Sequence, residues 1–169
     1  MNTRKSHSNL THLIFFTLLS LSSCQKEGAE LFEGSYSFKT SGTLTIDKKN
    51  SDNEEKSFKY QLSSESGQMN ILKENKSSAI ITMNIIGGQV LVIPAITEDN
   101  TLKINSFSHI INIKDGLQEV SMECSLDGEG KMYDDVVIIN FKYTGVGSNS
   151  TNTYTITDSE VNCVAKRNE

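Results

Sequence analysis

Hydrophobic and polar residues alternate along most of the chain with a period of two residues. The segment 34–47 is the clearest case, with Tyr36, Phe38 and Ile46 on one parity and Ser, Thr and Lys residues on the other. Such alternation is typical of a β-strand that has one face on a core and one face in water. Gly42 interrupts the apolar parity, and we expect a bulge or sharp bend there.

A second pattern occurs in the middle of the chain, where 79–86 and 90–96 are apolar on both parities. Gly87 and Gly88 join the two segments, and two successive glycines favour a two-residue hairpin turn with positive φ at both positions. The sequence therefore predicts a central hairpin that is buried on both faces.

Turns and loops are predicted from the polar stretches between the strands. The stretches 47–56 and 145–153 are expected to be long exposed loops. The strand 120–126 is followed by Asp127-Gly128-Glu129-Gly130, whose Asp-Gly sequence favours a hairpin turn before the next strand, 136–143.

The composition supports this pattern, since the chain of 169 residues contains four Ala, one Pro and no Trp, and it is rich in Ser, Thr and Asn. Helices use such a mixture poorly, whereas half-buried strands use it well. Regular strands with turns about every ten residues predict an all-β fold, an antiparallel β-barrel of about eight strands. A β-sandwich is the alternative, and 34–169 is expected to form a single domain.

Residues 1–23 have the features of a secretory signal peptide: a basic start at Arg4 and Lys5, then an apolar stretch at 13–21 that is shorter than the ~20 residues needed to cross a bilayer. The sequence Leu21-Ser22-Ser23-Cys24 resembles the lipobox of bacterial lipoproteins. The resemblance implies removal of 1–23 and attachment of lipid to the thiol of Cys24. An ordinary signal peptide that ends near a cysteine is the alternative.

Residues 24–33 are expected to form a tether between the lipid and the barrel. Within it, 25–30 is similar to the short charged signal that directs Bacteroidetes lipoproteins to the outer face of the outer membrane. The expected location is the outer membrane, on its periplasmic or cell-surface side. Removal of Arg4 and Lys5 would change the net charge from −5 to −7 and leave Arg167 as the single arginine, so nucleic acid is not an expected partner.

His109 is the single histidine that would remain after removal of 1–23, and it shares parity with Phe107, Ile111 and Ile113. We expect a structural histidine with satisfied hydrogen bonds rather than a catalytic base, because no nucleophile motif accompanies it. No catalytic residue, enzyme activity or cofactor is predicted.

Four carboxylates lie close together in the sequence, a ligand type that suits Ca²⁺. They are Asp127, Glu129, Asp134 and Asp135. The spacing of a known calcium loop is absent, so we interpret the segment as a turn and predict no metal site.

Cys124 and Cys163 both lie on the apolar parity of a predicted strand. In an exported protein they could form a disulfide, which would close a loop of about 40 residues. Two separate buried thiols are the alternative, because the sequence does not show whether their strands are neighbours.

Two stretches of the chain resemble a known family. The opening segment 32–38 with Gly42-Thr43-Leu44-Thr45-Ile46, and the later 127–130 leading into 134–143, are similar to the calycin-like or lipocalin-like lipoproteins of Bacteroides and its relatives. The resemblance implies an antiparallel β-barrel and transfers no catalytic residue.

Two functions are compatible with these features. The first is a binding module that holds a small apolar or amphipathic ligand inside the barrel, in contact with aromatic side chains. These are Tyr36, Phe38, Phe58, Tyr60, Phe141 and Tyr143. The second is a surface protein that contacts a glycan or another protein through the predicted loops 47–56 and 145–153.

Overall fold

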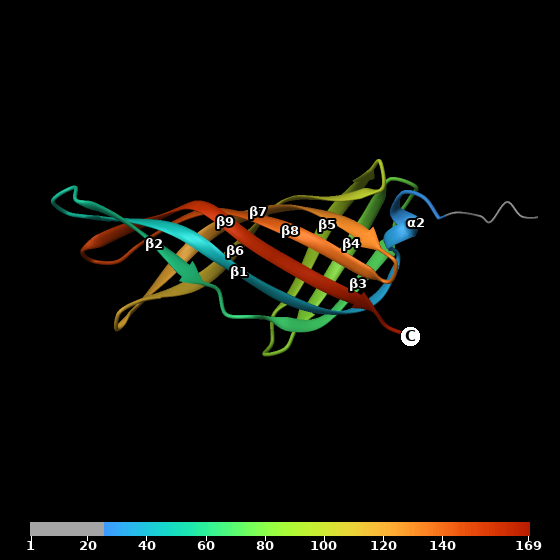
Figure 1. Ribbon diagram of the computed structural model, residues 1–169, viewed down its shortest axis with the longest axis horizontal. Helices are drawn as coiled ribbons and strands as arrows, with labels where there is room; N and C mark the ends of the chain where they lie inside the picture. The colour runs from blue at the N-terminus through green and yellow to red at the C-terminus, as the bar shows by residue number, and fades with distance from the viewer. Residues whose placement is uncertain (1–25) are drawn as a thin grey trace, which may run out of the picture.

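A single nine-stranded antiparallel sheet and one short helix account for the regular structure of residues 26–169, which are the residues that the computed structural model describes (Figure 1). The helix is α2 (Ala29–Phe32), and the strands are β1 (Gly34–Asn50), β2 (Glu55–Gln61), β3 (Ser66–Lys73), β4 (Ser78–Ile85), β5 (Val90–Glu98), β6 (Thr101–Asp115), β7 (Gln118–Tyr133), β8 (Val136–Ser148) and β9 (Asn152–Arg167). The predicted signal peptide and Cys24 lie outside the described residues.

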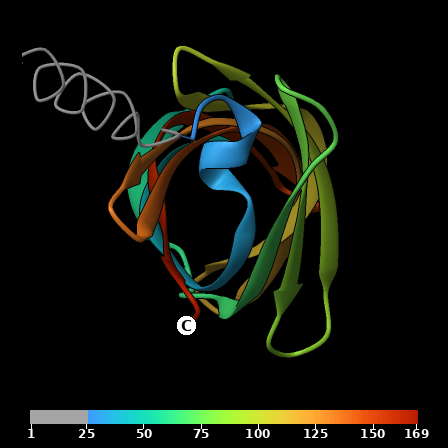
Figure 2. The same cartoon turned by 90° about the vertical axis from the view of Figure 1, so that its right-hand side faces the viewer.

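The sheet closes on itself because β1 pairs with β9 as well as with β3. Eight strands, β1 and β3 to β9, therefore form a ring, and β2 is added beside β1 (Figure 2). The predicted all-β antiparallel barrel is confirmed. It differs from the prediction in its long strands, since β1, β6, β7 and β9 each have 15 to 17 residues.

β1 changes its partner along its length. Its first part, from Gly34 to Lys39, pairs with β3, and the part from Thr43 to Lys49 pairs with β2. Gly42 lies at this change of partner, where a Cβ would come within 2.3 Å of the carbonyl oxygen of Glu160. The bulge predicted at Gly42 is instead a register shift between Thr45 and Ile46 in the pairing with β9, so Gly42 permits close strand approach rather than a bend.

The strand pairing around the ring is shortest between β5 and β6. These strands pair only over Ala95–Glu98 with Thr101–Ile104, and the register of β6 on β7 then shifts between Ile104 and Phe107. Beyond this point β6 pairs with β7 alone in the described chain. The first half of β5 and the second half of β6 therefore diverge and leave an opening in the wall of the barrel.

Three of the predicted loops and turns are corrected by the structure. The predicted long loops shrink to short turns, because strands run through Asn50 and resume at Glu55 in one case, and run through Ser148 and resume at Asn152 in the other. The predicted turn at 127–130 lies within β7. The chain turns later, at Asp134, whose φ is 52°.

Gly128 and Gly130 point into the barrel, where large side chains from β8 lie close to their backbone. A Cβ at Gly128 would lie 2.8 Å from the carbonyl oxygen of Asn140 and 3.1 Å from the Phe141 ring, and one at Gly130 would lie 3.1 Å from the Ile139 side chain. These glycines make room for core side chains. In the sequence alone, glycines with this packing role look the same as glycines that form a turn.

The hairpin between β4 and β5 is confirmed, with φ values of 110° at Gly87 and 118° at Gly88. Its turn has three residues, 86–88, rather than the predicted two, because the N–H of Ile85 donates to the carbonyl oxygen of Gln89 at 2.8 Å. The prediction that this hairpin is buried on both faces is wrong. Val90 and Val92 point outward and are 59% and 64% exposed.

Helix α2 closes one end of the barrel (Figure 2). Ala29 and Phe32 are fully buried in the core, so this part of the predicted tether is packed rather than solvated. The backbone N–H of Ala29 donates to the carbonyl oxygen of Lys76 at 3.0 Å, which ties the helix to the β3–β4 turn. Among the residues described, no helix is long and apolar enough to span a membrane.

Candidate functional site

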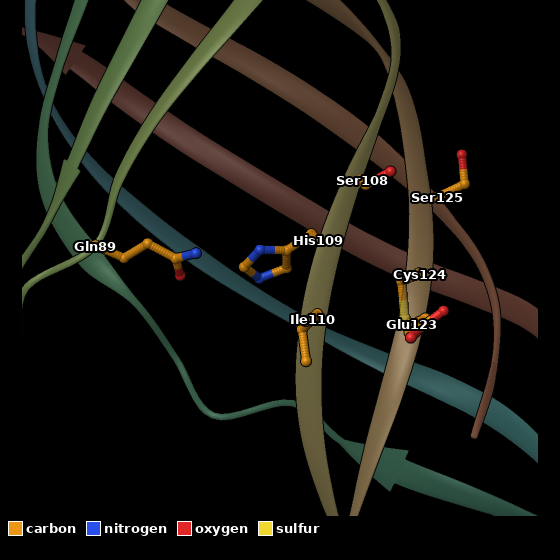
Figure 3. A pocket seen from close by; sticks show the side chains of 7 residues that line it. All are labelled: Gln89, Ser108, His109, Ile110, Glu123, Cys124 and Ser125. Carbon is orange, nitrogen blue, oxygen red and sulfur yellow. The ribbon is translucent and has the colours of Figure 1, made fainter. Parts of the chain in front are cut away.

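The opening between β5 and β6 leads into a cleft with a volume of about 550 Å³. Its lining comes from the β4–β5 turn and from adjacent segments of β6 and β7: Gln89, Ser108, His109, Ile110, Glu123, Cys124 and Ser125. Gln89 and His109 point toward one another from the two sides of the cleft, and Ser108 and Ser125 point away (Figure 3). A volume of this size is typical of sites for small ligands.

His109 is the chemically distinctive residue of the cleft. It shares the inward face of β6 with Phe107 and Ile111, as its parity predicts, and its side chain is 8% exposed. Its Nδ1 atom is buried and has no hydrogen-bond partner within the described chain. The expectation of a satisfied structural histidine is therefore wrong. An unpartnered buried polar atom carries a desolvation penalty of ~1 to 3 kcal/mol, which a bound partner would remove.

The imidazole also borders a second, smaller space of about 30 Å³. Glu65 from the β2–β3 connection, Tyr143 from β8 and Thr40 from β1 lie around it. This volume suits one water molecule. His109 thus lies between this small space and the open cleft.

Burial lowers the pKa of His109, and the nearby Glu65 carboxylate opposes the shift to a smaller degree. The ring is therefore neutral at pH 7, with one nitrogen that donates a hydrogen bond and one that accepts. Burial also raises the pKa of Tyr143 far above its usual value, so its hydroxyl stays protonated. The Glu65 carboxylate behind the ring is the charge that acts on His109, whereas Glu123 points outward on β7.

Apolar side chains flank the opening on both of the diverging strands. Leu91 on β5 and Phe107 and Ile111 on β6 are half-buried and lie on the inward parity of their strands. Phe107 also contacts Phe141 edge to face, with ring centroids 6.5 Å apart. These side chains flank the opening, while the lining of the cleft itself includes the apolar residues Ile110 and Cys124.

The six aromatic residues predicted to contact a ligand divide into two groups. Tyr36, Phe38 and Phe141 are core residues with at most 6% exposure. Phe58, Tyr60 and Tyr143 are half-buried and pack against the core from its edge. Of these six, Tyr143 borders the space behind His109.

Cys124 and Cys163 are free thiols, so the disulfide considered from the sequence is not formed. Cys124 lies on β7 opposite Gly145, and Cys163 lies on β9 opposite Ile139. Strand β8 separates them, and two strand spacings amount to ~10 Å, beyond the ~7 Å that a disulfide tolerates between Cα atoms. Cys124 instead lines the cleft.

The carboxylates considered for calcium do not converge. Asp127 and Glu129 point outward on β7, and Asp134 and Asp135 form the β7–β8 turn. The described residues contain no group of three or more His, Cys, Asp or Glu side chains placed to hold a metal ion.

Sequence reasoning missed the cleft, although one signal for it exists. Inward positions on β6 run through Leu102 and Ile104 and then through Phe107 and His109, so the alternation slips by one residue at 105–106. Such a slip is the pattern of a bulge, and it marks the point where β5 and β6 separate. Nothing comparable in the sequence indicates that Gln89 lies at the cleft, because its position opposite His109 depends on the geometry of the β4–β5 turn.

Comparison with known proteins adds a likeness of fold. No protein-family model matches the chain, and no curated protein matches it. Among solved structures, the chain is similar to a redesigned β-barrel, with 14% sequence identity and a TM-score of 0.36 over 88% of this chain and 100% of that one.

Proposed function

We propose that this protein is a lipid-anchored, non-enzymatic binding protein of the cell envelope that holds a small, uncharged amphipathic molecule in the cleft beside His109. The observation that carries the proposal is the buried Nδ1 of His109, which lacks a partner at the edge of a cleft of about 550 Å³. A ligand hydroxyl or amide group that bonds to the imidazole would remove the cost of this unpartnered atom.

The charges around the cleft favour an uncharged ligand. A carboxylate or phosphate group would approach Glu65 and would meet a neutral imidazole in place of a cation. Like charges at short range are unfavourable, and more so where water is excluded. Half-buried Leu91, Phe107 and Ile111 suit an apolar chain or ring on the same molecule.

Two other readings have less support. A ligand enclosed in the lumen would need space that the core side chains occupy, since Tyr36, Met69 and Met122 fill it with no exposure, and the small space beside His109 is about 30 Å³. Recognition through long loops is weakened because those segments are largely strand.

The lipid anchor rests on the lipobox-like sequence that ends at Cys24 and on the resemblance to Bacteroides barrel lipoproteins. Expression in a Gram-negative host with a palmitate analogue tests it. We expect label on the wild type, and no label and release from membranes for Cys24→Ser. Label retained by that variant would contradict the anchor.

Titration with 1-octanol and with octanoate, followed by NMR of the His109 imidazole, tests the ligand class. We expect 1-octanol to shift the imidazole signals and octanoate to shift them much less, because it carries a carboxylate. The Glu65→Gln variant should narrow this difference. The same response to both compounds would contradict the preference for an uncharged group.

The variant His109→Phe keeps the apolar packing of β6 and removes the hydrogen-bonding group. We expect it to remain folded and to lose most of its 1-octanol affinity, measured through the methyl signals of Leu91. The matched control Asn112→Ala changes an exposed outward side chain of the same strand that does not line the cleft, so it should bind as the wild type does. Unchanged affinity in His109→Phe would overturn the role of the imidazole.

A further inference from the structure

The outer surface of the barrel differs in charge from one group of strands to another. On β7 the outward residues include Glu119, Glu123, Asp127 and Glu129. On β3, β4 and β5 the outward positions from Gln68 to Ile96 carry no charge, and apolar residues predominate on β5. We call this surface the apolar face and define it by Leu72, Ile80, Val90, Val92, Pro94 and Ile96.

The residues of the apolar face form one row across the three strands and a column along β5, with Asn70 and Thr82 beside Val92. Leu72 pairs with Ile80, and Ile80 pairs with Pro94, so these three side chains form one row across the sheet. Leu72 and Val92 are 60% and 64% exposed. Contiguous exposed apolar residues on this scale mark a contact surface.

The position of the apolar face links it to the anchor. β3, β4 and β5 lie at the end of the barrel that α2 closes, and α2 is bonded to the β3–β4 turn through Lys76 (Figures 1 and 2). The described chain starts at Lys26, and Cys24 precedes it by two residues, a reach of ~7 Å. A lipid on Cys24 would therefore hold this end of the barrel at the membrane surface.

The size of the apolar face distinguishes between two occupants. Three strands spaced ~4.8 Å apart and eight residues long cover about 400 Å² in all, and the apolar residues occupy only part of this area. A stable protein interface buries ~800 Å² on each partner, so this area is too small for a stable dimer. A bilayer needs no such area when an acyl anchor already holds the protein, since a second weak contact then adds to the first.

We propose that the apolar face lies against the bilayer that carries the lipid on Cys24, so that the barrel rests on its side with β3, β4 and β5 toward the membrane. The inference rests on the proposed lipid anchor. The contact is apolar, and it therefore persists in high salt and on uncharged lipids, unlike the attachment of a basic surface.

The test uses the full lipidated protein in phosphatidylcholine nanodiscs that contain a lipid with a nitroxide near the headgroup. We expect the methyl signals of Val90 and Val92 to lose at least twice as much intensity as those of Val164, in low and in high salt. Val164 is a matched control, since it is 46% exposed on the outside of β9, across the ring from β5, and pairs with the part of β1 nearer to α2. Replacement of Val92 by Lys should reduce the loss at Leu72, and replacement of Val164 by Lys should leave it unchanged.

Three other outcomes would overturn the proposal, and each of them can be told apart from the others. Wild-type protein that fails to co-elute with nanodiscs removes the anchor and the inference together. Co-elution with equal intensity loss at Val92 and Val164 removes the inference alone. Changes at Val92 that depend on protein concentration, and are the same without the nitroxide, show that a second copy occupies the face.

Discussion

The guanidinium of Arg167 lies 4.9 Å from the centroid of the Tyr36 ring, close to the C-terminal end of β9. Its Nη1 and Nη2 atoms donate to the carbonyl oxygens of Glu33 at 2.5 Å and Leu31 at 3.2 Å, while the Tyr36 hydroxyl donates to that of Phe32 at 2.6 Å. Carbonyl groups at the end of a helix have no partner within the helix. These two side chains therefore donate hydrogen bonds to the free carbonyl groups at the end of α2 and hold the helix in the mouth of the barrel.

Replacement of Arg167 by Ala should lower the free energy of unfolding by ~1 to 3 kcal/mol, because it removes two hydrogen bonds and the stacking on Tyr36. Arg167→Lys should recover part of this loss, since an ammonium group cannot form both bonds in the same plane. Urea unfolding followed by circular dichroism measures both changes. Lys166→Ala, an exposed neighbour on β9, is the control, and an equal effect there would contradict the assignment.

Gly128→Ala should destabilise the barrel by ~1 to 3 kcal/mol, because its Cβ would meet the backbone of β8, which cannot move without disturbing the pairing. Gly130→Ala should cost less, because the atoms nearest to its Cβ belong to the Ile139 and Leu102 side chains, which can adjust. Thermal unfolding measures both variants. If Gly130→Ala were the more destabilising variant, the backbone of β8 would adjust more easily than the side chains near Gly130 do.

Asp115 should stabilise the end of the barrel opposite α2 in a pH-dependent way. Its carboxylate forms an ion pair with Lys48 at 2.5 Å and accepts a hydrogen bond from Tyr154 at 2.7 Å. The bond from Lys48 is the main cause that lowers the pKa of Asp115, with that from Tyr154 second. Because the folded pKa is below the unfolded one, the stabilisation is complete above ~pH 4 and is lost as pH falls through the lowered pKa.

Asp115→Asn should therefore lower the urea midpoint at pH 7, and its difference from the wild type should shrink below ~pH 4. Asp127→Asn is the control, since Asp127 is exposed on β7 with no ion pair in the described structure. A difference for Asp115→Asn that is constant with pH would assign the effect to packing rather than to charge.

The two thiols of the barrel should react slowly in the native protein. Burial raises the pKa of Cys124 to about 11 and that of Cys163 to about 12, so very little thiolate is present at pH 8. We expect almost no alkylation by iodoacetamide in native conditions, with Cys124 modified before Cys163. Denaturation without reductant should expose both thiols to the reagent, as read by intact mass. A barrel that remains unmodified would contain a disulfide.

The sequence predicts the barrel class well because alternation reports directly on which face of a strand is buried. It predicts strand ends poorly. Polar residues at 47–50 and at the end of β8 continue their strands because both partners of β1 and both partners of β8 extend equally far. Pairing of this kind depends on neighbours that are distant in the sequence, so local composition cannot reveal it.

The candidate site was only partly predictable for a similar reason. The inward direction of His109 follows from its parity, but its missing partner depends on the separation of β5 from β6. Likewise, the apolar outward residues of β5 have the composition of a buried hairpin, and only the arrangement of the ring shows that no strand covers them in the described chain.

The four-residue pairing between β5 and β6 also has a consequence for how the protein fluctuates. Other neighbours in the ring share six or more paired positions, whereas this one holds the circle closed with four. Amide protons of Ala95–Glu98 and Thr101–Ile104 that bond across this pairing should therefore exchange with solvent before those of the β8–β9 pairing. The barrel would then behave as a continuous curved sheet fastened by one short latch, whose release widens the cleft without unfolding the rest.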